Sequence, residues 1–171
     1  MNRKLGEITI EGKLQPQAVE LEQAILGALL IDNESLSDAI DSLREEYFYK
    51  MEHQKIFSAI VELFNKTQPV DILTVSEELK RMKQLEKIGG ISYITELTNN
   101  ISSSSNTEFH ARIVAEKYIK RSLISISNNI IGEAFDDSID IFDLLNKAEE
   151  KLFSVTEGCL LYTSDAADEA W

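Results

Sequence analysis

The chain has 171 residues and a formal charge of −13, from 17 basic and 30 acidic side chains. A charge of this sign repels phosphate, which argues against non-specific DNA binding as the main activity. The hydrophobic content of 43% supports a folded core, yet no apolar run is long enough to cross a membrane. Because the N-terminus also lacks the pattern of a secretion signal, we expect a cytoplasmic protein without membrane association.

The first half of the sequence predicts a loose leader followed by the helices of a globular head. Residues 1–15 show no periodicity, and Pro16 is expected in the first turn of a helix that continues to Ile31. Apolar residues on several sides of this helix predict a central position in the core. A short helix through Leu36 and a longer one over residues 51–64 follow. The predicted apolar face of the longer helix consists of Ile56, Phe57, Ile60, Val61 and Phe64.

The second part of the head carries a start signal and a stop signal for one helix. Thr74 and Glu77 have the spacing of a capping box, in which each side chain bonds to the other residue's free backbone amide, so we expect a helix to begin there. The Gly89-Gly90 pair is expected to end it, because glycine adopts the left-handed conformation at little cost. One more short helix completes a head that spans residues 16–101.

Residues 102–157 predict a long helical hairpin. Ser105 and Glu108 repeat the capping-box pattern, and no helix breaker follows for about twenty residues. Gly132 and the segment 136–138 are then expected to turn the chain into a second amphipathic helix. The residues predicted to pack between the two helices are Ile119, Leu123, Ile126 and Ile130 on the first and Leu145, Ala148 and Leu152 on the second.

The apolar surface of this hairpin exceeds what two helices can cover by packing on each other, so we expect a partner to bind it. The residues that flank the predicted seam are the candidates for self-association with a second copy of the chain. They are Phe109, Ile113, Tyr118 and Phe142. The predicted fold class is therefore all-α, with a globular multi-helix head followed by a long helical hairpin.

Residues 158–171 do not continue this pattern. They contain Cys159, which is the only cysteine, and the only tryptophan, but no lysine or arginine. The stretch resembles the translation of a sequencing adaptor, so we expect a non-native tail; the alternative is an ordinary acidic tail.

The sequence offers no site for nucleotide or metal chemistry. A phosphate-binding P-loop needs a second glycine upstream of Gly-Lys and a Ser or Thr after it, and the only Gly-Lys pair, Gly12-Lys13, has neither. His53 and His110 are too far apart for a helical metal pair, and Cys159 alone cannot form a thiolate cluster. We predict no catalytic residue, cofactor or metal in this chain, and we interpret His53 as a structural hydrogen-bonding residue.

Two clusters of basic residues could contact phosphate. They are Lys80, Arg81, Lys83 and Lys87 in the head and Arg112, Lys117, Lys120 and Arg121 on the first hairpin helix. Both are interleaved with glutamate and lack aromatic residues on which bases could stack. We therefore interpret them as sites of solubility or protein contact, with DNA bound weakly if at all.

Five blocks, in order, resemble the N-terminal domain of DnaB-type replicative helicases. They are PQAVE with EQAILGALL (residues 16–30), YFY with His53 and IFSAI (47–60), PVD with LTVSEEL (69–79), GGISYITEL (89–97) and ARIVAEK (111–117). The resemblance extends over about residues 14–157 and is specific because the blocks keep their order. Leu21 and the Phe109-His110 pair depart from the family's usual residues, outside the core pattern.

The resemblance implies a structural role. In this family a helical head and a hairpin form the N-terminal tier of a hexamer, where hairpins pair between subunits and build a collar of three dimers. The collar recruits primase through the primase's C-terminal helical domain, and a helicase loader is a further candidate partner. ATP and Mg²⁺ are bound by a motor domain beyond a linker helix. This chain would lack that motor and would not itself be an enzyme, whereas its parent would be an ATP-dependent DNA helicase. The alternative is a free-standing helical adaptor or helicase inhibitor that mimics the collar.

Overall fold

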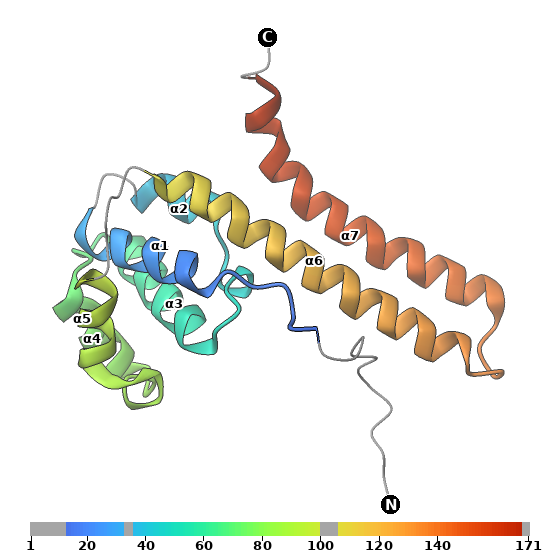
Figure 1. Ribbon diagram of the computed structural model, residues 1–171, viewed down its shortest axis with the longest axis horizontal. Helices are drawn as coiled ribbons and strands as arrows, with labels where there is room; N and C mark the ends of the chain where they lie inside the picture. The colour runs from blue at the N-terminus through green and yellow to red at the C-terminus, as the bar shows by residue number, and fades with distance from the viewer. Residues whose placement is uncertain (1–12, 33–35, 100–105, 169–171) are drawn as a thin grey trace, which may run out of the picture. The chain divides into compact units, whose positions relative to one another are not determined.

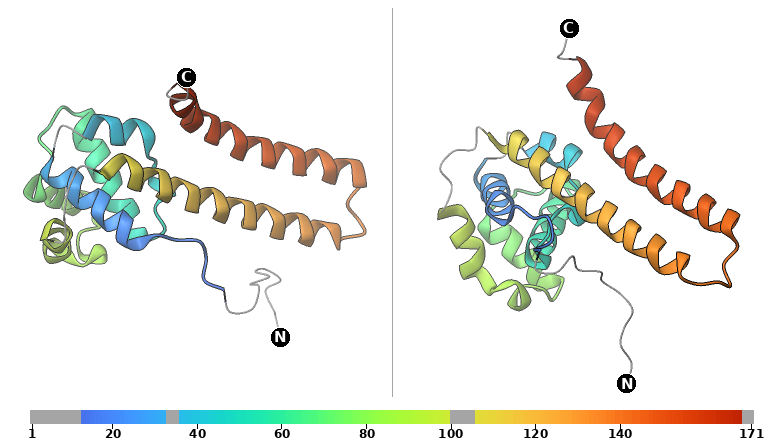
Figure 2. Two further views of the ribbon diagram at one scale, coloured as in Figure 1. Left: turned by 45° about the horizontal axis from the view of Figure 1, so that its top comes forward. Right: turned by 45° about the vertical axis from the view of Figure 1, so that its right-hand side comes forward.

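A computed structural model describes the backbone of residues 13–32, 36–99 and 106–168, and the side chains as far as residue 158. Within these ranges every regular element is helical, which confirms the all-α prediction (Figures 1 and 2). The elements are α1 (Val19–Ile31), α2 (Leu36–Ser42), η1 (Glu45–Tyr47), α3 (Met51–Asn65), α4 (Ile72–Arg81), η2 (Glu86–Ile88), α5 (Gly90–Asn99), α6 (Thr107–Ala134) and α7 (Ile141–Asp168). They form two compact units, a head over residues 17–118 and a second unit of the described residues before Gln17 and after Tyr118.

Helix α1 occupies the centre of the head, as its apolar residues on several sides predict. Ile25, Leu26 and Leu29 are fully buried, and the helix contacts both α3 and α5. The predicted start was wrong, because α1 begins at Val19 and not in the turn containing Pro16. Ala18 has a non-helical φ of −145°, and its carbonyl accepts the first helical hydrogen bonds.

Helix α3 presents one buried stripe to the core, at the expected three- and four-residue spacing. His53, Ile56, Ile60 and Leu63 are all buried on this stripe. Phe64 was predicted to face inward, but its side chain is 36% exposed. Leu63, which follows Ile60 by three residues, takes the inward position instead and is 3% exposed.

The capping box of α4 lies about one turn earlier in the sequence than predicted. Asp71 is the N-cap, and its carboxylate accepts hydrogen bonds from the backbone amides of Leu73, at 2.8 Å, and Thr74, at 2.9 Å. The Thr74 hydroxyl accepts the Asp71 amide in return, so threonine is the third helical residue of the box and not its cap. Sequence reasoning placed the helix start at Thr74 because an Asp-x-x-Thr box lacks the more familiar glutamate.

This cap leads to a prediction that separates the two assignments. Replacing Asp71 with alanine should destabilise the head by about 0.5–2 kcal/mol, because two amides of the first turn lose their acceptor. Replacing Glu77 with alanine, which the sequence pattern implicated, should change stability by less than about 0.5 kcal/mol. Urea denaturation followed by circular dichroism measures both, and an equal effect of the two substitutions would contradict the observed cap.

The end of α4 also differs from the prediction. The helix ends at Arg81, eight residues before the glycine pair, and Lys83 adopts a left-handed φ of 56°. The Gly89-Gly90 pair instead follows η2, with φ of 101° and 71°. A Cβ at Gly89 would lie 3.1 Å from the Cβ of Tyr93, so this position favours glycine for its close packing as well as for its backbone.

Helices α6 and α7 lie side by side in opposite directions, which agrees with the predicted hairpin (Figures 1 and 2). The first turns of α6 belong to the head, where Ala111 and Val114 are buried in the core. Gly132 lies inside α6 and does not turn the chain, contrary to the prediction; the turn comes after Ala134. The proposed cap at Ser105 lies outside the described residues.

The contact between the hairpin helices uses partly different residues from the predicted seam. Ile126, Ile130 and Ala148 are half-buried, as predicted. Leu145 and Leu152 remain 57% and 44% exposed, and Leu123 is 40% exposed, so these three predictions were wrong. On α7 the half-buried positions are instead Leu144, Ala148, Lys151 and Val155. Lys151 turns towards α6 because its ammonium group lies 3.2 Å from the Glu133 carboxylate.

Candidate interaction surfaces

The most elaborate polar site in the head is a buried chain of hydrogen bonds. Glu22 on α1 is 1% exposed, and its Oε2 lies 2.6 Å from Nδ1 of His53 on α3. Nε2 of the same imidazole lies 2.7 Å from the hydroxyl of Tyr93 on α5. The Glu22 carboxylate also accepts the backbone N–H of Tyr49 at 2.7 Å. Three helices are thereby joined through one histidine.

This network is structural in character. A neutral His53 satisfies every group if Nδ1–H donates to Glu22 and Nε2 accepts the Tyr93 hydroxyl proton. The Gln23 amide then donates to the Tyr93 oxygen at 3.5 Å. Both ring nitrogens have partners within the head and the residue is fully buried, which agrees with the interpretation of His53 as a structural hydrogen-bonding residue.

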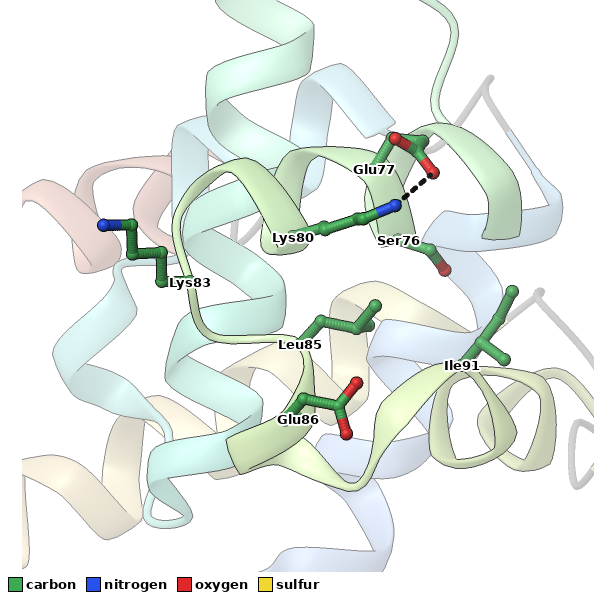
Figure 3. Close-up of a pocket in the computed structure, with 7 residues that line it drawn as sticks. All are labelled: Ser76, Glu77, Lys80, Lys83, Leu85, Glu86 and Ile91. Atoms are coloured by element: carbon green, nitrogen blue, oxygen red, sulfur yellow. Dashed lines mark ion pairs between the residues drawn. The ribbon is translucent and has the colours of Figure 1, made fainter.

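Two shallow hollows border α4 on the head. The first, of about 490 Å³, is lined by Leu85 and Ile91 together with charged residues of both signs (Figure 3). The Lys80 ammonium group lies 4.0 Å from the Glu77 carboxylate across its rim. The charges here are balanced, so this hollow lacks the surplus of cations that a phosphate site needs.

The second hollow, of about 660 Å³, lies between α3 and α4. At its edge the Arg81 guanidinium hydrogen-bonds the buried Glu78 carboxylate and lowers its pKa, and the Lys66 ammonium assists from 3.4 Å. The arginine of the first basic cluster is therefore occupied by a protein contact, consistent with the interpretation given from sequence.

The described part of the chain shows neither a metal centre nor a membrane span. Within it, no three His, Cys, Asp or Glu side chains converge as metal ligands. None of its helices combines the length and the apolar character needed to cross a bilayer. These statements concern only the residues that the structure describes.

The four residues proposed for self-association occupy different surroundings. Phe109, near the start of α6, is 60% exposed, and Phe142, in the first turn of α7, is 71% exposed. Ile113 is half-buried. Tyr118 turns to another side of α6, where its ring lies 4.9 Å from that of Tyr47. Burial there raises the pKa of Tyr47. Tyr118 therefore packs within the head, whereas the two phenylalanines are available to a second molecule.

Sequence reasoning missed several exposed apolar residues of the hairpin. Phe135 at the end of α6 is 86% exposed, and Ile141 and Phe153 on α7 are 58% and 59% exposed. Ile124 and Ile131 on α6 are exposed as well. The signal was present in the helical spacing, since positions seven apart return to nearly the same face. Sequence reasoning named only the predicted seam and the four residues that flank it, and none of these five belongs to either set.

The turn that presents Phe135 and Phe142 is held by its own hydrogen bonds. The Asp136 carboxylate accepts the backbone N–H of Ser138 at 3.0 Å and its hydroxyl at 2.6 Å, and these bonds lower the pKa of Asp136. The Asp140 carboxylate accepts the amide of Phe142 at 2.9 Å and so caps α7. Both aromatic rings are thus held out by an ordered turn.

The chain consists of a helical head and a hairpin with exposed apolar residues, and comparison with known proteins identifies its family. The family described as the DnaB-like helicase N-terminal domain matches residues 14–116. The chain belongs to this family.

Similar proteins of known identity are replicative helicases. The chain is 46% identical over 146 residues to the replicative DNA helicase DnaB of Rhodothermus marinus. This match covers 85% of this chain and 15% of that protein. It is 40% identical over 147 residues to the replicative DNA helicase DnaB of Geobacillus stearothermophilus, with 85% of this chain and 32% of that protein covered. The chain therefore spans about a third or less of the length of these two relatives.

Two solved structures extend the similarity into the hairpin. The N-terminal domain of DnaB helicase from Mycobacterium tuberculosis is 30% identical, with a TM-score of 0.77, and the match covers 82% of this chain and 99% of that one. A structure of a DnaB-like replicative helicase and its interactions with primase is 26% identical, with a TM-score of 0.65, and 88% of this chain and 34% of that one are covered. Both similarities agree with the fold that the blocks of sequence predict.

Proposed function

We propose that the chain is the N-terminal collar domain of a cytoplasmic replicative DNA helicase. In this role its hairpin pairs subunits within a hexamer, and the resulting collar recruits primase during DNA replication. The observation that carries the proposal is the set of exposed apolar residues on α6 and α7, including Phe109 and Phe142 at 60% and 71% exposure. Exposed aromatic residues at ordered positions are typical of surfaces that a partner covers.

Membership of the family supports the remaining parts of the proposal. The relatives are helicases that extend well beyond the region similar to this chain. One structural neighbour is described with its interactions with primase. We infer that the parent is an ATP-dependent DNA-unwinding enzyme and that its motor lies outside this chain.

Two measurements test this function. Analytical ultracentrifugation of the 171-residue chain should show a dimer or a higher oligomer at micromolar concentration. Titration with the C-terminal helical domain of a primase should show saturable binding in isothermal calorimetry. A monomer at high concentration that also fails to bind the primase domain would contradict the proposal.

A third expected result concerns nucleotides. The chain should neither bind nor hydrolyse ATP, because its only Gly-Lys pair lacks the glycine and the hydroxyl residue of a P-loop. Isothermal titration with Mg-ATP measures the affinity, and a phosphate-release assay measures turnover. Micromolar affinity would show that the chain holds a nucleotide site of another kind.

A further inference from the structure

Helix α7 turns its more apolar side away from α6. The half-buried side chains of α7 mark the side that lies against α6, and they are Leu144, Ala148, Lys151 and Val155. Ile141, Leu145 and Leu152 are 58%, 57% and 44% exposed. At 100° per residue, the middle of this exposed group lies about 70° round the helix from the middle of the half-buried group. The contact with α6 therefore includes a lysine where a leucine was available.

Glu133 on α6 is the carboxylate that this lysine meets. Its side chain is 27% exposed and belongs to the half-buried side of α6, together with Ile126 and Ile130. Oε1 of Glu133 lies 3.2 Å from the Lys151 ammonium group, and Oε2 lies 3.9 Å from that of Lys147. Oε2 is shielded from solvent and accepts no hydrogen bond from the described residues. The carboxylate is thus partly removed from water, and two lysines of α7 balance its charge.

The two lysines hold one flank of α7. They are four residues apart, so they lie one above the other on the helix. Helical side chains lean towards the N-terminus of their own helix, which for α7 is the end at the hairpin turn. Glu133 lies near that turn, two positions before Phe135, so both ammonium groups reach the same carboxylate.

A different orientation of α7 would bury more apolar surface. Turning the helix by about 70° would place Leu145 and Leu152 against α6 and so add apolar contact. The same turn would carry Lys147 and Lys151 away from α6 and bring leucine side chains towards Glu133. A partly buried carboxylate that loses its cations is costly, so the ion pairs oppose the more apolar contact.

We propose that Glu133 determines which side of α7 faces α6. Through Lys147 and Lys151 it holds α7 in the orientation that leaves Leu145 and Leu152 on the outside, so it acts as a positioning residue for the exposed apolar side of the hairpin. In the proposed function that side is available to a partner, and only this consequence rests on the proposed function. The orientation itself is a property of a single molecule.

Hydroxyl-radical labelling read by mass spectrometry measures this orientation, because the reaction of a side chain increases with its exposure. Samples are labelled at a concentration where sedimentation velocity shows a monomer, so that a second copy covers nothing. In the unchanged chain, Leu145 and Leu152 should be labelled more strongly than Leu144.

Removal of the charge is the first test. Glu133→Leu should lower the labelling of Leu145 and Leu152 by at least about twofold and raise that of Leu144, because a turn of about 70° exchanges the covered and exposed sides. Glu133→Gln, a smaller change, should shift the labelling in the same direction. Glu150→Leu is the matched control, since Glu150 is exposed on α7, and it should leave the labelling unchanged. Unaltered labelling in Glu133→Leu, with helical circular dichroism retained, would overturn the proposal.

A charge exchange separates the ion pairs from the shape of the side chains. Glu133→Lys alone should disturb the labelling, because it brings three cations together. Adding Lys147→Glu and Lys151→Glu restores the attraction with the signs exchanged, so the labelling should return to that of the unchanged chain. A combined variant that stays helical without this recovery would also contradict the orienting role. A chain that is monomeric at every concentration but shows the expected labelling would reject only the proposed pairing, so the two failures are distinguishable.

Discussion

Replacing Glu22 with alanine is expected to destabilise the head by at least about 1.5–3 kcal/mol, which is the contribution of a single hydrogen bond to a charged group. The carboxylate is 1% exposed and lies 2.6 Å from the His53 imidazole. It also accepts the backbone amides of Tyr49 and Lys50. Without it, the fully buried imidazole of His53 would lose its partner, and a buried polar group without a partner costs more than the lost bond itself. Glu22→Gln keeps one acceptor oxygen, so it should reduce the stability of the head by less than Glu22→Ala.

Urea denaturation monitored by circular dichroism measures this loss, and Glu20→Ala is the matched control. Glu20 lies in the same first turn of α1 but is exposed, so its replacement should change stability by less than about 1 kcal/mol. An effect of Glu22→Ala no larger than that of the control would show that the buried network does not stabilise the head.

The second large effect concerns self-association. Substituting both Phe109 and Phe142 with aspartate should weaken the oligomer by at least about 100-fold, or about 2.7 kcal/mol. Burial of one such ring contributes roughly 1.5–3 kcal/mol. A two-fold interface contains each ring twice, so each substitution acts at two places. An aspartate also adds the cost of removing a charge from water to the loss of the apolar contact.

Sedimentation velocity over a concentration series measures the change, with Leu73→Asp as the control. Leu73 is 69% exposed, close to the 71% of Phe142, but lies on α4 in the head. The control should leave the oligomer unchanged, and both proteins should keep the same helical circular dichroism. An oligomer that is indifferent to the double substitution would contradict pairing through the hairpin.

Most of the helical architecture was predictable from the sequence. The buried stripe of α3, the central position of α1 and the continuous helix of α6 follow from apolar spacing and the absence of helix breakers. These features are local, since a three- or four-residue repeat determines which side of a helix is apolar wherever that helix lies. The blocks of sequence also identified the family to which the chain belongs.

Helix ends were less predictable than helix faces. The Thr74-Glu77 spacing and the Asp71-Thr74 spacing both satisfy a capping pattern, and only the backbone conformation shows that Asp71 is the cap. Likewise Gly132 could end a helix but lies within one. A glycine ends a helix only where the neighbouring residues do not already stabilise the helical conformation.

The particular partners of side chains were decided by the tertiary structure. Glu22 and His53 are 31 positions apart and Tyr93 lies 40 beyond His53, so no periodicity relates them. In the same way, the position of Tyr118 beside the predicted seam indicated an exposed side chain. In the folded chain, its ring packs against that of Tyr47. Sequence determines which residues are apolar and how they repeat along each helix. Which of them are covered depends on distances between helices that only the folded chain establishes, and on that basis Phe142 stays exposed while Tyr118 is packed within the head.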